Sequence, residues 1–170
     1  MRDLTTALAL AVIAAACGSS TTPAPIVSMV AGTWSGTVTA TAVSGGPECL
    51  DTFRPIVGVP DRYTLVATQT GTTVFATDTS ETSGRSCDYE GTAGNGLFSI
   101  AASACHPGGM TISCSGTPRD VYVVKRLLTM TVSGNALDGT GTDTWSVFPV
   151  GTTVGSLAQI TVSSHFVLTR

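Results

Sequence analysis

Apolar and polar residues alternate along most of this chain from residue 32 onward. In "GTWSGTVTATAV", residues 32–43, one face carries Trp34, Gly36, Val38, Ala40 and Ala42, and the other carries Thr and Ser. The same period of two returns at 63–69, 72–78, 87–93, 97–102, 110–114, 121–133, 136–148 and 158–170. A period of two predicts β-strands with one face in a core and the other in water.

Turn residues separate these segments at short intervals, near residues 45, 71, 84, 95, 108, 118, 134 and 151. "GNG" at 94–96 and "GN" at 134–135 are typical of tight hairpins, because Gly and Asn accept a positive φ. Short connections favour antiparallel neighbours. We therefore predict an all-β fold, an antiparallel up-and-down β-barrel of eight or nine strands, with no helix after the N-terminal segment. A barrel removes the two exposed sheet edges, and a β-sandwich is the alternative.

The first residues predict export. Residues 4–16, "LTTALALAVIAAA", follow Arg2 and form an apolar, helix-prone run that is shorter than the roughly 20 residues of a spanning helix. Such a run before small residues is typical of a signal peptide, here residues 1–16. "IAAAC" resembles the lipobox of bacterial lipoproteins, which implies cleavage after Ala16 and a lipid on Cys17. Ala14 stands where Leu is commoner in that family, so secretion without a lipid is the alternative.

The predicted signal peptide and lipid-attachment site divide the chain into segments. Residues 17–30 are rich in Gly, Ser, Thr and Pro, which predicts a flexible tether. Residues 31–170 form the predicted barrel domain. We expect the domain to lie in the periplasm or outside the cell, held to the outer or plasma membrane through Cys17.

Four cysteines remain besides Cys17, and an even number in an exported chain predicts two disulfides. Three pairings are possible. "CHPGGMTISC" contains Pro and two Gly and can turn back on itself, which favours Cys105–Cys114 and leaves Cys49–Cys87. A metal site that includes His106 is disfavoured, because the spacing fits no zinc pattern.

A second resemblance concerns the first strand. "AGTWSGTV" is similar to the start of lipocalin-like barrels, where G-x-W opens the first strand; Gly32 and Trp34 match this motif. The resemblance implies that an Arg of the last strand, here Arg170, covers the tryptophan. It also implies a barrel that holds a ligand.

Three residues are candidates for contact with such a ligand: Trp34, Trp145 and Asp143. Both tryptophans are most simply core residues, and lining a cavity is the alternative. Asp143 shares the predicted inward face with Trp145, so it needs a buried partner or a position at the barrel mouth. "DGTGTD" at 138–143 lacks the EF-hand order and is predicted to be strand.

The sequence contains little that indicates catalysis or nucleic-acid binding. Asp88 and Glu90 share a strand face that we expect to be solvated, and His106 and His165 stand in no catalytic motif. Only 11% of residues are charged, with no basic run, which disfavours nucleic acid. We predict no enzyme, cofactor or metal. The expected function is binding of a small apolar ligand, and the alternative is a structural or protein-interaction domain of the cell envelope. The oligomeric state stays open.

Overall fold

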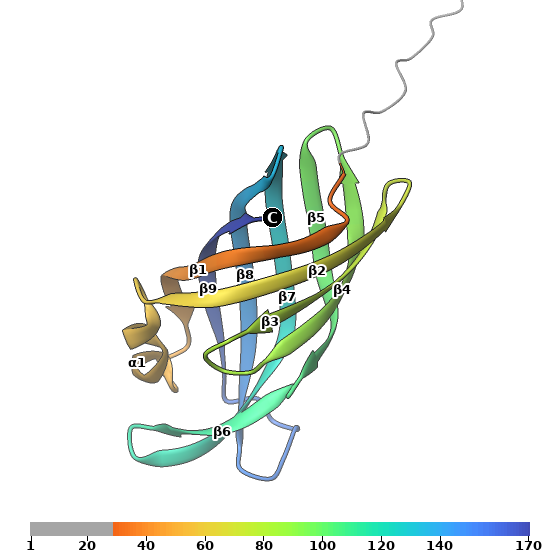
Figure 1. Cartoon of the computed structure of the whole chain (residues 1–170). Coiled ribbons are helices and arrows are strands. Elements are labelled where there is room, and N and C mark those ends of the chain that lie inside the picture. Colours follow the sequence, from red (N-terminus) through yellow and green to blue (C-terminus); the bar gives the residue numbers. More distant parts are fainter. Residues whose placement is uncertain (1–28) are drawn as a thin grey trace, which may run out of the picture.

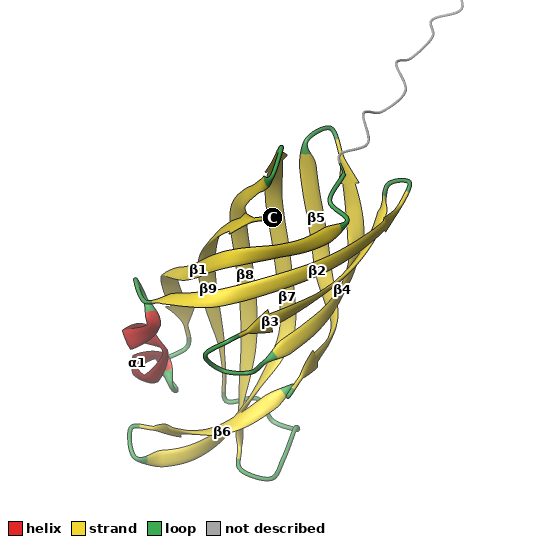
Figure 2. Ribbon diagram, viewed as in Figure 1, coloured by secondary structure: helices red, strands yellow, loops and turns green. Residues whose placement is uncertain are grey.

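The computed structural model of the protein describes residues 29–170, which form a β-barrel (Figures 1 and 2). The elements, in chain order, are β1 (Gly32–Gly45), α1 (Leu50–Phe53), the 3-10 helix η1 (Arg54–Ile56), β2 (Pro60–Thr70), β3 (Thr73–Ser80), β4 (Ser86–Gly94), β5 (Leu97–His106), β6 (Gly109–Cys114), β7 (Thr117–Ser133), β8 (Ala136–Pro149) and β9 (Ala158–Thr169). The predicted signal peptide, Cys17 and the tether up to residue 28 lie outside the described residues.

The strands form one antiparallel sheet that closes on itself. Consecutive strands pair from β1 to β5 and again from β7 to β9. β9 pairs with β1, and β5 pairs with β7 through Leu97–Ala101 against Leu127–Thr131. These two seams make a closed eight-stranded barrel with one extra strand, β6. The predicted barrel is confirmed and the sandwich alternative is wrong.

The extra strand β6 extends the sheet beyond the barrel wall. It pairs only with the first part of β7, from Gly109 opposite Tyr122 to Cys114 opposite Thr117. The later part of β7 pairs with β5. In Figure 1, β6 lies below the barrel, at the end opposite the C-terminus. β7 therefore changes partner along its length.

Two of the predicted hairpin turns are present. Asn95 and Gly96 have φ values of 53° and 78° and join β4 to β5. Gly134 has a φ of 57° in the turn between β7 and β8, where Ser133 pairs with Ala136. Both turns need residues that tolerate the left-handed region.

The prediction that this domain contains no helix is wrong at one place. The connection from β1 to β2 contains the single turn of α1 and the 3-10 turn of η1. Phe53 is the buried residue of α1, and its ring lies 5.7 Å from that of Trp145. Besides this aromatic contact, Thr52 of the helix donates a hydrogen bond to the carbonyl of Ser113 in β6. A search for periodic patterns does not detect a helix of four residues.

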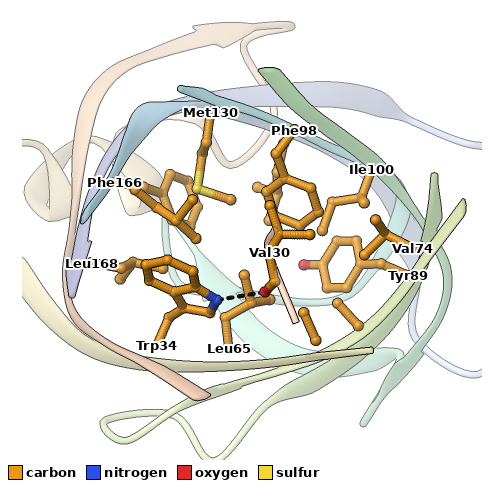
Figure 3. Close-up of a cluster of buried hydrophobic side chains, with 14 of the residues drawn as sticks. Val30, Trp34, Leu65, Val74, Tyr89, Phe98, Ile100, Met130, Phe166 and Leu168 are labelled. Atoms are coloured by element: carbon orange, nitrogen blue, oxygen red, sulfur yellow. Dashed lines mark hydrogen bonds between the residues drawn. The ribbon is translucent and has the colours of Figure 1, made fainter. Parts of the chain in front are cut away.

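One apolar cluster fills the barrel end that carries the C-terminus (Figure 3). Trp34 lies fully buried in it and donates a hydrogen bond from Nε1 to the carbonyl of Val30, 2.8 Å away. Val30, the last residue of the predicted tether, is itself buried there. The guanidinium carbon of Arg170 lies 4.2 Å from the Trp34 ring centroid. The expected cover of this tryptophan by Arg170 is thus observed, although Arg170 follows β9 and is not part of it.

A second, smaller cluster lies around Trp145, toward α1 and β6. Its buried members are Ala40, Cys49, Phe53, Cys114, Val121, Trp145, Val147, Ile160 and Val162. The barrel interior therefore has two apolar regions that do not merge. What separates them is polar, as described below.

The inward face of β1 changes at a bulge between Ala40 and Ala42. Trp34 and Ala40 point inward as predicted, but Ala42 is exposed and Val43 packs against the second cluster instead. The expectation that Ala42 shares the inner face is wrong, because the extra residue reverses the alternation.

All four predicted cysteines are in disulfides, but the predicted pairing is wrong. Cys49 bonds to Cys114 and Cys87 bonds to Cys105. Cys87 and Cys105 are direct cross-strand partners in β4 and β5. β6 pairs with β7 and not with β5, so Cys114 lies away from Cys105 and next to Cys49, which precedes α1.

Over residues 29–170, no helix combines the length and apolar character that crossing a membrane requires.

Candidate functional site

A cavity of about 410 Å³ lies within the barrel on the side of α1, between the α1–η1 connection and the turn from β3 to β4. Its apolar lining comes from Val38, Ala40, Pro55, Ile56, Val59, Pro60 and Val162. Its polar lining comes from Asp61, Tyr63, Ser80, Thr82, Ser83, Arg85, Arg126, Asp143 and Ser164. The cavity thus has an apolar wall and a charged, hydrogen-bonding wall, within the roughly 300–1,000 Å³ usual for small-molecule sites.

Strand phase places two of the charged residues in the interior. Along β7, Met130 and Leu128 point into the first apolar cluster, and Arg126 is the next residue in the same phase. Along β8, Asp143 stands in phase between Gly141 and Trp145. A Cβ on Gly141 would lie 2.5 Å from the Phe166 ring, so the glycine leaves room for that ring next to the charged layer.

Asp143 bridges two guanidinium groups. Its Oδ1 lies 3.1 Å from Nε of Arg126, and its Oδ2 accepts a hydrogen bond from Nη2 of Arg85 at 3.3 Å. The Asp143 side chain is only 13% exposed. A buried carboxylate between two cations is well compensated, and removing it would leave both cations with less support.

Arg126 is also paired on its other side. Its Nη2 donates to the hydroxyl of Tyr63 and lies 3.4 Å from Oδ2 of Asp78. Asp78 is fully buried and accepts hydrogen bonds from the Tyr89 hydroxyl and from the backbone N–H of Cys87 at 2.7 Å. These groups form a polar layer between the two apolar clusters.

The surroundings change the proton affinity of these groups. Burial raises the pKa of Asp78, and the charge of Arg126 opposes this shift only in part. Burial works against the charge of Arg126, but the carboxylates of Asp143 and Asp78 outweigh it and raise the pKa of the guanidinium. Burial and the neighbouring Arg126 lower the pKa of Arg85. The layer therefore depends on mutual compensation of charge.

Arg85 has fewer polar partners than Arg126. It comes from the β3–β4 turn, and its guanidinium carbon lies 4.7 Å from the ring centroid of Trp145. Nε of Arg85 and Nε of Arg126 are both buried without a hydrogen-bond partner, but Nε of Arg126 lies 3.1 Å from Oδ1 of Asp143. Since Nη2 is already bonded to Asp143, Arg85 has donor capacity left over beside the cavity.

Asp61 closes the charged wall at the start of β2. Its Oδ2 accepts from the Ser80 hydroxyl at 2.6 Å, and its Oδ1 accepts from the Thr82 hydroxyl at 2.6 Å. Both carboxylate oxygens thus have donors. The cavity lining therefore contains two guanidinium groups and two carboxylates, and the acceptor oxygens of both carboxylates are already engaged.

The structure separates the three candidate ligand contacts. Asp143 lines the cavity. Trp145 contacts one member of the charged layer, Arg85, whose guanidinium lies over the indole ring. Trp34 is buried in the first cluster, toward the opposite end of the barrel, under Arg170. Of these three, only Asp143 is placed to touch a ligand in the cavity.

The other candidates for chemistry lie on the outside. Asp88 and Glu90 are exposed, as predicted, while Cys87 and Tyr89 point inward. His106 is exposed, and His165 lies 3.3 Å from Asp138 on the outer face. Within residues 29–170, no group of three or more His, Cys, Asp or Glu side chains is placed to hold a metal ion.

The sequence reasoning missed most of the charged layer. Arg126 and Asp78 keep the inward phase of Leu128 and Ala76, so the alternation itself marked both as interior residues. Arg85 lies at the end of a turn, where no periodicity applies, and only the hairpin geometry brings it inward. Comparison of the chain with protein-family models, with curated proteins and with solved structures finds no match.

Proposed function

We propose that this protein is a lipid-anchored lipoprotein, held outside the cytoplasm, whose β-barrel binds a small and largely apolar ligand. The observation that carries the proposal is the cavity of about 410 Å³ inside the barrel wall. Seven apolar side chains line it, and a charged layer forms one wall. An apolar pocket with a few fixed polar groups is the usual form of a small-molecule site.

Two further observations support the cellular part of the proposal. The four cysteines of the barrel form two disulfides, which persist in oxidising compartments. The lipobox-like "IAAAC" precedes a tether that leads to the barrel. The proposal includes no catalytic role: the carboxylate pair Asp88 and Glu90 is exposed and lies outside the cavity lining.

Ligand binding is tested by filling the cavity. Val38 lines it and is partly buried, whereas Val167 is exposed on the outer face of β9. We expect the neutral dye N-phenyl-naphthylamine to gain fluorescence with the wild-type protein. Val38→Phe should weaken that binding at least tenfold, and the matched Val167→Phe should leave it unchanged. Equal binding by all three proteins would place the dye elsewhere and contradict the proposal.

The anchor is tested separately. A Cys17→Ser protein should lose acyl labelling and leave the membrane fraction, while a Cys105→Ser protein should keep its label. Membrane association of the Cys17→Ser protein equal to that of the wild type would contradict the lipoprotein assignment. A wild-type protein that is acylated but does not bind the dye would instead favour the alternative, an envelope domain without a small ligand.

A further inference from the structure

The charges around the cavity limit the ligand that it accepts, if the proposed binding function holds. Two guanidinium groups, of Arg85 and Arg126, line the cavity together with two carboxylates, of Asp61 and Asp143. The lining is therefore balanced in charge. An ionic head group would add an uncompensated charge to a partly buried site, which carries a large desolvation cost.

Hydrogen bonding further distinguishes the possible head groups. The oxygens of Asp61 and Asp143 already meet donors or cations. Both guanidinium groups, in contrast, have a buried Nε without a hydrogen-bond partner; that of Arg126 lies 3.1 Å from Asp143, whereas Arg85 contacts Asp143 through Nη2. A ligand group that only donates therefore finds its acceptors already engaged, whereas a group that accepts finds a guanidinium with unused donors.

Asp78 strengthens the bias against an anion. It lies outside the cavity lining, behind Arg126, 3.4 Å from that guanidinium. Any negative charge on Asp78 compensates Arg126 from behind and leaves less positive charge for a ligand. The apolar wall of Val38, Ile56 and Val162 suits a hydrocarbon body.

We infer that the cavity binds a neutral amphipathic molecule: an aliphatic or aromatic body against the apolar wall, and an uncharged acceptor, such as an ester or ketone oxygen, at Arg85. This rests on the proposed function and narrows it. A fatty-acid carboxylate and a protonated amine are the excluded classes.

Three probes with the same hydrocarbon chain test the inference: methyl octanoate, octanoate and octylamine. Each is used at pH 7 to displace N-phenyl-naphthylamine from the full chain in lipid nanodiscs, with empty nanodiscs to correct for partition into lipid. We expect methyl octanoate to bind at least tenfold more tightly than either ion. Octanoate or octylamine binding as tightly as the ester would overturn the inference and leave ligand binding in place. Failure of the dye itself to bind would overturn the proposed function.

Charge variants give a second and independent test. Asp143→Asn removes one carboxylate from the lining, so octanoate should gain at least tenfold relative to the ester. Arg85→Gln removes one cation, so octylamine should gain and the ester should lose affinity. Asp138→Asn, on the exposed face of the same strand as Asp143, is the matched control and should leave the ranking unchanged. An unchanged ranking in folded Asp143→Asn and Arg85→Gln proteins would contradict the inference.

Discussion

Arg170 covers Trp34 at the seam where the first and last strands of the barrel meet. The guanidinium carbon lies 4.2 Å from the indole centroid, and Nη2 donates to the carbonyl of Met29 at 2.6 Å. β1 and β9 pair along most of their length at this seam. One side chain at the end of β9 thus connects Met29, which lies shortly before β1, with Trp34 of β1.

We expect Arg170→Ala to lower the free energy of unfolding by about 1–2 kcal/mol. The loss combines a cation–π contact at a partly exposed site with one charge-assisted hydrogen bond. Arg170→Lys keeps the charge but not the planar group, so it should recover only part of the loss. Urea titration measures both values. A midpoint for Arg170→Ala equal to that of the wild type would show that the contact contributes nothing.

The disulfide pairing is checked by peptide mapping without reduction. The expected products join the peptide of Cys49 to that of Cys114, and the peptide of Cys87 to that of Cys105. A Cys105–Cys114 peptide from the native protein would refute the observed pairing.

The two disulfides should differ in their effect on stability. The Cys49–Cys114 bond spans 65 residues and the Cys87–Cys105 bond spans 18. In the chain-entropy model these lengths correspond to about 4 and about 3 kcal/mol. The Cys49→Ser/Cys114→Ser protein should therefore be the less stable of the two double variants in urea. The reverse order would show that packing at the buried Cys87, and not loop length, dominates.

Arg126 should be energetically coupled to Asp78. Arg126→Met leaves the fully buried Asp78 without its cation, which typically costs about 3 kcal/mol. Adding Asp78→Asn removes the uncompensated charge, so the double variant should be more stable than Arg126→Met alone. A double-mutant cycle in urea measures the coupling. Simple additivity of the two single changes would contradict the ion pair.

The raised pKa of Asp78 predicts the sign of one pH effect. Between the unfolded-state pKa of about 4 and the higher folded-state pKa, the unfolded chain has released the Asp78 proton while the folded chain still holds it. The contribution of this group to stability is therefore present at low pH and lost as pH rises through the folded-state pKa. The wild type should lose stability relative to Asp78→Asn between pH 4 and higher pH.

Urea unfolding at a series of pH values measures this difference. Asp88→Asn is the control for removing an acidic side chain from the exposed wall. A gap between wild type and Asp78→Asn that grows in favour of the wild type with rising pH would show that ion pairing, and not burial, determines the pKa of Asp78.

The sequence predicts the barrel well because the patterns that identify its strands and turns are local. Alternation locates the strands, and residues such as Asn95 and Gly134 locate the turns. These features depend on neighbours along the chain, which the sequence displays directly.

The disulfides and the charged layer depend on which strands become neighbours. Cys114 is separated from Cys105 because β6 pairs with β7, and no residue within 105–114 indicates this strand pairing. Arg126 and Asp78 are inward by phase, yet their mutual contact requires strands β3 and β7, which are not adjacent in the wall. Bulges such as that after Ala40 further change the phase without a clear signal.

The change of partner along β7 has a consequence for solubility. Beyond Ala101, the residues of β5 pair with β4 alone, so one side of that stretch has no strand opposite it. A row of open backbone groups of this kind invites strand addition from another molecule and aggregation. Lys125, the sole lysine of the sequence, stands here, at a bulge between Val123 and Lys125. An exposed charge and an irregular backbone are two features that discourage such pairing at an open strand edge.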